Sequence, residues 1–452
     1  MARVTSVFVL DGSYRRYDRV VIGGSPLRLF RLSAAGQRVV EAIEQRQPLP
    51  SSHSKLTERL VDAGAIPPNP EGSSFSAADI TVVVPAFNAT PSATLLDEHA
   101  GETIVVDDGS SPQLATAPAI RTVRLPINRG PATARNAGLA EVTTPLVAFV
   151  DTDVDLKSGW LQPLLAHFDD PLVALVAPRV RSSDGASMLA TYEAVRSPLD
   201  LGDQSARIAA GTRVSYVPAA AIVVRTDALR AIGGFDESLR TGEDVDMVWR
   251  LIEAGYRCRY EPAAVVHHRP RTTLSAWARQ RIAYGRSAAA LDLKHPGAVA
   301  PLRMSGWSAA VWALVLVRRP GAAFVVGTGT ILALRRKLDD VPPQESLRLA
   351  GLGHLYAGRQ VASAITRVWW PLALLAALLV PRLRVPLLGA AIVPPLVDWL
   401  ERGGPNGGAR YIALRLADDA AYGLGVWIGA VEQRSVGALS PKFTSWPGRT
   451  AG

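Results

Sequence analysis

Val147-Ala148-Phe149-Val150-Asp151-Thr152-Asp153 is the stretch that decides the fold: four uncharged, mostly β-prone residues run directly into two carboxylates one residue apart. Such an apolar run is typical of a strand buried on both faces of a parallel sheet. Asp151 and Asp153 then lie at its carboxyl end, where ligands bind in open α/β sheets. Two carboxylates on a tight turn suit Mg²⁺ or Mn²⁺, which in turn suits the oxygens of a diphosphate. The alternative for this turn alone is an ordinary solvated acidic turn.

Strand-like and helix-like patterns alternate on the amino-terminal side of this stretch, beginning at Asp79. Apolar runs at 80–85, 103–106 and 122–125 predict three further strands, and a helix is expected to open near Asn128. A later run, 220–224, predicts another strand. Strands separated by helices predict a parallel, nucleotide-binding sheet.

Polar residues follow these predicted strands. Asp107 or Asp108 could accept a hydrogen bond from a nucleotide base or a ribose hydroxyl. Arg129 and Arg135 lie before and within the next helix, and the fork of donors on arginine suits phosphate. Each residue alone is equally consistent with a solvated surface role. Because their loops follow strands of one sheet, we expect them to converge on one edge.

Four motifs in order, VVVPAFN, VVDDGS, NRGPATARNAG and FVDTD, resemble those of family 2 glycosyltransferases, which have the GT-A fold. The resemblance covers residues 80–271 and implies a nucleotide-sugar donor, usually a UDP-sugar. It places Asp107 and Asp108 at the uridine, Arg135 near the diphosphate, and Asp151 and Asp153 at the metal. The same motifs add to the predicted donor site Pro85, Phe87, Asn88, Asn128 and Arg129.

Acidic residues also open a later predicted helix, in the segment FDESLRTGEDVDMVWRL. Glu243, Asp244 and Asp246 would suit the positive end of that helix without any catalytic role. The family resemblance places the catalytic base at Asp244. An inverting transfer needs one carboxylate to take the proton of the attacking hydroxyl, while a metal ion stabilises the departing diphosphate.

A predicted strand from Tyr260 ends in His267 and His268. Neighbouring strand residues face opposite ways, so at most one of the two points into a site. In the related enzymes a histidine at the end of this strand joins the metal, and position favours His268, on the same face as Ala264 and Val266. An ordinary exposed histidine is the alternative.

Residues 1–70 read as a small α+β domain, with short strands, a helix capped by Ser33 and a second helix over 54–63, followed by a linker at 71–78. This outline resembles the winged-helix-like peptide-binding domains of ribosomal-peptide modification systems, such as the chaperone of pyrroloquinoline-quinone biosynthesis. The resemblance implies a precursor peptide or its modifying enzymes as a partner. A stabilising cap without a ligand is the alternative.

The chain becomes apolar after residue 300, with arginines between the apolar runs of 307–317, 322–334 and 368–397. Each uninterrupted piece is shorter than the roughly 20 residues that a straight membrane span needs. Interfacial helices on an anionic cytoplasmic lipid surface are therefore expected, because arginines favour that surface. The alternative is the buried helical domain of a soluble protein.

The composition is consistent with a cytoplasmic enzyme that binds an anionic substrate or surface. The net charge of +9 suits nucleic acid, an anionic membrane or an anionic substrate, and no nucleic-acid-binding module is recognisable. The single cysteine, Cys258, excludes an internal disulfide and is expected to be a buried apolar residue. The first ten residues do not form a signal peptide.

The sequence therefore predicts a GT-A transferase domain over 79–300, a peptide-recognition-like domain over 1–70 and a membrane-associated helical region over 301–452. The three-part arrangement resembles glycosyltransferases of ribosomal-peptide modification systems, which implies a peptide-derived acceptor and a β-1,4-linked glucose chain built from UDP-glucose. One alternative is a membrane glycosyltransferase with a lipid or polysaccharide acceptor, although the Gln-x-x-Arg-Trp motif of processive synthases is missing after Asp244. The other is a non-catalytic nucleotide- or peptide-binding protein.

Overall fold

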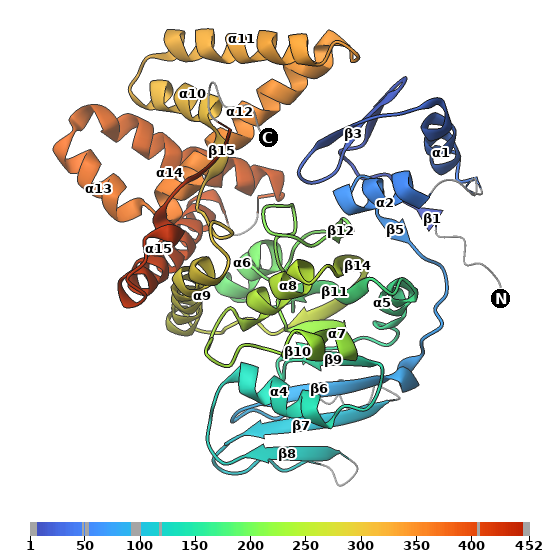
Figure 1. Ribbon diagram of the computed structural model, residues 1–452. Coiled ribbons are helices and arrows are strands. Elements are labelled where there is room, and N and C mark those ends of the chain that lie inside the picture. The colour runs from blue at the N-terminus through green and yellow to red at the C-terminus, as the bar shows by residue number, and fades with distance from the viewer. Residues whose placement is uncertain are drawn as a thin grey trace. The chain divides into compact units, whose positions relative to one another are not determined.

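The computed structural model describes residues 7–47, 49, 54–91, 101–116, 120–404 and 407–445 (Figure 1). The chain divides into two compact units. The first comprises residues 1–185 and 196–270, and the second comprises residues 186–195 and 271–452. Each is described by itself below.

A nine-stranded mixed sheet forms the core of the first unit. Its strands are β6 (Ile80–Ala86), β7 (Glu102–Asp108), β8 (Arg121–Leu125), β9 (Leu146–Val150), β10 (Val154–Asp155), β11 (Val173–Ser182), β12 (Ala206–Arg207), β13 (Ala221–Arg225) and β14 (Arg257–His268). They lie in the order β10-β14-β11-β13-β9-β6-β7-β8, and β12 pairs with β14. The predicted α/β fold is confirmed.

The prediction of a parallel sheet is correct for only part of it. Strands β9, β6, β7 and β8 are parallel, but β13 runs antiparallel to both β9 and β11. An apolar pattern shows that a strand is buried and does not show its direction. Because Ala221 pairs with Val150, the start of β13 lies at the carboxyl end of β9, beside Asp151.

The sheet is buried because its apolar runs face helices on both sides. Val82, Val84, Ala148 and Val150 are fully inaccessible to solvent. Helix α4 (Pro131–Glu141) packs on β6 and β7 (Figure 1), and Gly138 permits this approach, since a Cβ there would lie 2.3 Å from Val83 Cγ1. The remaining helices of this unit include α5 (Gln162–Leu165), α7 (Thr226–Ala231) and α8 (Glu243–Glu253).

The N-terminal part of the first unit has its own apolar core, which includes Val21, Phe30, Val40, Leu60 and Ile66. Its elements are β1 (Val7–Phe8), β2 (Arg15–Tyr17), β3 (Val20–Gly23), β4 (Arg28–Arg31), α1 (Ala34–Glu44), α2 (Ser54–Ala63) and β5 (Pro68–Asn69). Ser33 caps α1 as predicted, accepting a hydrogen bond from Gly36 N. Of the first predicted strand, Val4–Ser6 lie outside the described residues.

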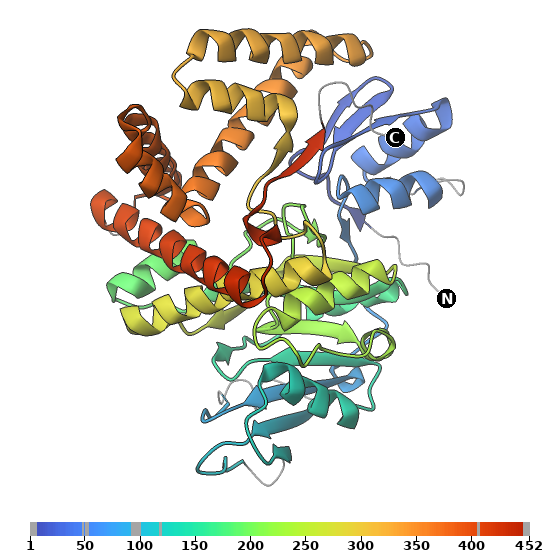
Figure 2. The same cartoon turned by 60° about the vertical axis from the view of Figure 1, so that its left-hand side comes forward.

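The second unit is mainly helical. Its helices are α6 (Met188–Arg196), α9 (Leu274–Lys294), α10 (Gly306–Leu316), α11 (Pro320–Lys337), α12 (Pro343–Arg367), α13 (Trp370–Leu379), α14 (Arg384–Glu401) and α15 (Gly408–Glu432). The last residue of α6, Arg196, is assigned to the first unit. Strand β15 (Arg303–Ser305) pairs with β16 (Lys442–Ser445). Helices α9 and α15 lie side by side (Figure 2). Glycines allow this close contact: a Cβ on Gly285 would lie 1.9 Å from Tyr422 O.

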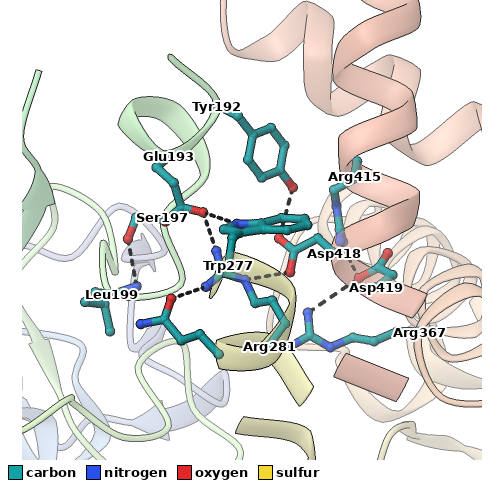
Figure 3. Close-up of polar contacts among 11 residues, drawn as sticks. Tyr192, Glu193, Ser197, Leu199, Trp277, Arg281, Arg367, Arg415, Asp418 and Asp419 are labelled. Atoms are coloured by element: carbon teal, nitrogen blue, oxygen red, sulfur yellow. Dashed lines mark hydrogen bonds and ion pairs between the residues drawn. The ribbon is translucent and has the colours of Figure 1, made fainter. Parts of the chain in front are cut away.

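A buried network of charges joins three helices of this unit (Figure 3). Arg281 on α9 pairs with Glu193 on α6 and with Asp418 on α15. The Trp277 indole N–H also donates to Glu193, at 2.8 Å, and the Tyr192 hydroxyl donates to Asp418, at 3.0 Å. The network therefore fixes α6 against α9 and α15.

Apolar side chains remain exposed on α13 and α14. The segment Pro381–Glu401 has 21 residues and a mean hydropathy of 1.4, enough by length and composition to cross a membrane. The prediction that every apolar piece is too short to span is therefore wrong for this segment, because its helical conformation begins at Pro381, includes Arg382 and Arg384, and extends beyond Val397 to Glu401. Helices α12 and α13 meet at a bend of 87°.

Candidate functional site

The acidic turn after β9 lies beside the first residues of β13. Asp151 N donates to Ala220 O at 2.9 Å, and Asp151 Oδ1 accepts from Arg135 Nη2 at 2.9 Å. The Asp151 side chain is 32% exposed. Burial raises the pKa of Asp151, the Arg135 guanidinium opposes this rise, and the Asp153 carboxylate adds to it.

His268 lies against the same turn because β10 pairs antiparallel with the end of β14, which sets Val154 opposite His268. His268 Nε2 is 3.3 Å from Asp153 Oδ2, and Arg269 N donates to Asp153 O at 2.9 Å. His267 is paired with Asp155 instead, and burial lowers the pKa of the His267 imidazole.

The turn offers oxygen and nitrogen ligands of the kinds that Mg²⁺ and Mn²⁺ accept. Within the described residues, however, no three His, Cys, Asp or Glu side chains gather into a ready metal site. Asp153 and His268 together provide two ligands. This donor set fits a divalent cation only if a bound ligand, such as a diphosphate, supplies further oxygens.

Asp244 lies in the first turn of α8, which begins after Gly242 in the left-handed region (φ 85°). Asp244 Oδ2 accepts from Ala219 N at 3.1 Å, and Oδ1 accepts from Val245 N at 2.8 Å. Since Ala219 and Ala220 are adjacent, one short backbone segment contacts both Asp244 and Asp151. Burial and the neighbouring Glu243 carboxylate raise the pKa of Asp244 to about 7, although Arg135 acts against them.

Arg135 links the acidic turn to α8. Its guanidinium donates to Asp151 at 2.9 Å and to Glu243 Oε1 at 2.7 Å, and it lies over the Phe235 ring. The Arg135 side chain is only 4% exposed. Its Nε has no hydrogen-bond partner among the described residues. Arg135 was predicted to lie near a diphosphate, and its observed contacts are with carboxylates on both sides of the site.

Asp107 and Asp108 are almost completely buried. Asp107 accepts from Ser110 N and Leu114 N and pairs with Arg124. Burial raises the pKa of Asp107, but these hydrogen bonds and Arg124 outweigh it and leave the pKa lowered. Asp108 accepts from Asn128 Nδ2, Arg129 N and Gly130 N. Both carboxylates therefore hold neighbouring loops in place.

The other predicted donor-site residues surround these loops. Asn88 has φ 50°, and its Oδ1 accepts from Ser111 N. Phe87 is 48% exposed and Pro85 is half-buried. Asn128 is half-buried, and Arg129 is exposed with Nη2 3.7 Å from Glu237 Oε2.

The sequence did not predict the roles of two contributors to the site. Ala219 acts through its backbone N–H, which residue type does not reveal. The sequence predicts Glu243 only as an acidic residue at the positive end of a helix, whereas in the structure it forms a salt bridge with Arg135, 108 residues away. The order of residues along the chain does not predict a contact between residues so far apart in sequence. The acidic pair Glu243-Asp244 beside the glycine at 242 was the available signal.

Comparison with known families gives two matches: glycosyl transferase family 2 over residues 81–197, and glycosyl transferase family group 2 over residues 146–392, more than half of the chain. The chain is 42% identical to the pre-mycofactocin glycosyltransferase of Mycobacterium tuberculosis over 97% of this chain and 100% of that protein. It is 30% identical to the succinoglycan biosynthesis protein ExoO of Rhizobium meliloti, over 41% of this chain and 59% of that one. Among solved structures, a mannosyltransferase from Pyrobaculum calidifontis in complex with GDP-Man and Mn²⁺ matches at a TM-score of 0.35 and 18% identity, covering 63% of this chain and 91% of that one.

Proposed function

The chain belongs to glycosyltransferase family 2, and from that premise we propose that it transfers a sugar, with inversion, from a UDP-sugar to a hydroxyl of a peptide-derived acceptor, pre-mycofactocin. The main support for the proposal is the pair of hydrogen bonds from Arg135 to Asp151 and Glu243, which join the acidic turn to the helix that carries Asp244. A carboxylate with a pKa raised to about 7 thereby lies beside a turn suited to a diphosphate. A general base is most effective when its pKa is near the working pH.

The proposed chemistry needs one base and no covalent enzyme intermediate. As the acceptor oxygen attacks the anomeric carbon, its proton passes to Asp244 and the bond from that carbon to the diphosphate oxygen breaks. Ala219 N and Val245 N orient the Asp244 carboxylate. Mg²⁺ or Mn²⁺, held by Asp153 and His268 with Asp151 close by, would supply positive charge for the leaving diphosphate.

The identities of sugar and acceptor are supported by likeness alone. A relative 42% identical over nearly the full length of both chains is named for action on pre-mycofactocin. We propose the same acceptor here, with glucose from UDP-glucose added in β-1,4 linkage. The donor would lie against the loops held by Asp107 and Asp108. The domain of residues 1–70 would recognise the precursor peptide or its modifying enzymes.

A membrane-associated enzyme with a lipid or polysaccharide acceptor is the second candidate. The exposed leucines of α13 and α14 favour it, since a lipid surface would cover them. The two candidates differ in the role of residues 1–70. Deleting this domain should abolish transfer to a peptide-derived acceptor, whereas transfer to a lipid or polysaccharide should fall only as far as the loss of the Arg213 contacts with Asp11 and Ser25 lowers it.

The decisive experiment compares the wild-type chain with Asp244→Asn in assays of transfer from UDP-glucose to a peptide-derived acceptor, followed by mass. Loss of the base should reduce kcat by about 10²- to 10⁴-fold, while UDP affinity changes little. Asp227→Asn is the matched control, because Asp227 also lies in the first turn of a helix and is exposed. Near wild-type turnover by Asp244→Asn would remove the proposed base.

A further inference from the structure

A buried arginine on β14 lies away from the candidate active site. Arg259 on β14 is only 6% exposed. Its Nε has no hydrogen-bond partner, and no ion pair of its guanidinium is found within the described residues. Burying a charge is costly unless it is paired and hydrogen-bonded. Arg259 therefore has one buried donor, Nε, that the described residues leave without an acceptor.

Two further arginines share its face of the sheet. Arg207 on β12 is the antiparallel partner of Arg259, and directly opposed residues project their side chains to the same side. Arg257 lies two residues from Arg259 on β14 and so faces the same way. Like charges directly opposed across strands repel. The fold alone gives no reason for this arrangement.

Asp170 and Asp62 attract Arg259 at longer range, but both carboxylates form their ion pairs with Arg257. Arg257 holds Asp62 through Nε at 2.8 Å and Asp170 through Nη1 at 3.0 Å. Arg207 reaches the main-chain oxygen of Asp62 and not its carboxylate. Burial and then the charge of Arg28 lower the pKa of Arg207, and burial lowers that of Arg259 to about 10. Four arginines against two aspartates leave an excess of two positive charges.

We propose that this arginine cluster (Arg28, Arg207, Arg257 and Arg259) binds a dianionic oxyanion, a phosphate or phosphate monoester, between Arg207 and Arg259. Guanidinium groups bind phosphate through paired N–H donors. The excess of two charges matches a dianion better than a single carboxylate. The site is separate from the proposed donor site, because His268 lies nine positions beyond Arg259 on β14, a length of roughly 25–30 Å along an extended strand.

The test measures binding of inorganic phosphate to the full chain by calorimetry, with and without saturating UDP. The wild-type protein should bind phosphate in both conditions and bind acetate, a monoanionic carboxylate, far more weakly. Arg259→Met should weaken phosphate binding on the order of tenfold or more. In phosphate-free buffer the same variant should have a higher Tm than wild type, because it removes an unpaired buried charge.

Arg179→Met is the matched control, since Arg179 also lies on the sheet but holds Asp200 at 2.8 Å. It should lower the Tm and leave phosphate binding unchanged. Arg207→Met provides a second variant if Arg259→Met folds poorly, and should also weaken phosphate binding. Wild-type phosphate affinity in both cluster variants, or phosphate binding that UDP abolishes, would overturn the proposal. Neither outcome depends on glycosyl transfer.

Discussion

Single residues connect the parts of the candidate site, and Arg135 is the clearest example. Its guanidinium is enclosed by Asp151, Glu243 and the Phe235 ring. Burial lowers its pKa, but the surrounding carboxylates outweigh this and raise it, so Arg135 stays charged. The charge of Arg135 lets the Asp151 and Glu243 carboxylates lie close together, and so holds the turn after β9 near α8.

Arg135→Met should therefore lower both stability and activity. It leaves Glu243 buried without a counter-charge, which costs about 3–5 kcal/mol when one member of a buried pair is removed. Chemical denaturation measures the loss. Arg129→Met is the control, because Arg129 is exposed and its ion pair is long, at 3.7 Å; it should change stability by less than about 1 kcal/mol. Equal losses in the two variants would contradict the bridging role of Arg135.

The raised pKa of Asp244 predicts a pH dependence. Because the base must be ionised, kcat/KM should rise about tenfold per pH unit below the pKa of about 7 and level off above it. The folded-state pKa lies above the ordinary value of 3.8, so Asp244 contributes stability below about pH 4 that is lost as the pH rises through 7. Asp244→Asn should then gain Tm relative to wild type as the pH increases from 4 to 8. A flat rate profile would contradict the prediction.

Much of this site could be predicted at the residue level, because each motif follows a strand and strand ends meet at one edge. The family resemblance and the alternation of faces along the strand predicted His268 rather than His267, and His268 lies 3.3 Å from Asp153. Neither predicted the contacts of Arg135. Helix α4 is rich in alanine and has no strong apolar face, so nothing in its pattern marks Arg135 as buried.

At the scale of elements, the reversed strand β13 matters most. Its antiparallel pairing with β9 brings the backbone of residues 219–220 to Asp151 and Asp244. The pattern of apolar residues predicted that β13 exists but could not give its direction. The direction depends on the end of the sheet at which the preceding loop delivers the chain. The loop after β12 is in turn fixed by contacts with the N-terminal domain.

Arg213 makes that contact. Its Nη2 donates to Asp11 Oδ2 at 2.8 Å and its backbone N donates to Ser25 Oγ at 2.7 Å. Arg213→Met should release the loop that leads to Ala219, lowering kcat for transfer by roughly ten- to a hundredfold with UDP affinity unchanged. The control is Arg16→Met, which removes ion pairs to Glu41 and Glu44 inside the N-terminal domain. Identical kinetics in both variants would show that the Arg213 contact does not orient the loop.

At the scale of the whole molecule, α13 and α14 expose many apolar side chains. Monomeric soluble proteins rarely expose large contiguous apolar patches. The exposed side chains on these two helices include Leu372, Leu374, Leu375, Leu378, Leu379, Val385, Leu388, Val393 and Leu400. Arg382 and Arg384, both exposed, lie in the turn that joins the helices. This pairing of leucine and arginine suits an anionic lipid surface.

The full chain should therefore co-float with vesicles containing phosphatidylglycerol, and less with neutral phosphatidylcholine vesicles. Leu378→Glu should reduce flotation, because Leu378 is 72% exposed and would carry a charge into the lipid. Leu172→Glu is the control, since Leu172 is an exposed leucine of the first unit. Failure of the wild-type chain to float with either vesicle would contradict membrane association.

The path of the chain through α6 affects how the two units could be produced as separate fragments. Residues 186–195 leave the sheet-containing unit, join the helical one and return, so the polypeptide passes between the units at three places. A fragment ending at Pro270 would keep α6 but lose Arg281 and Asp418, which pair with Glu193 and Tyr192 respectively. No single cut can yield both halves intact, and such a fragment should be recovered mainly as aggregate.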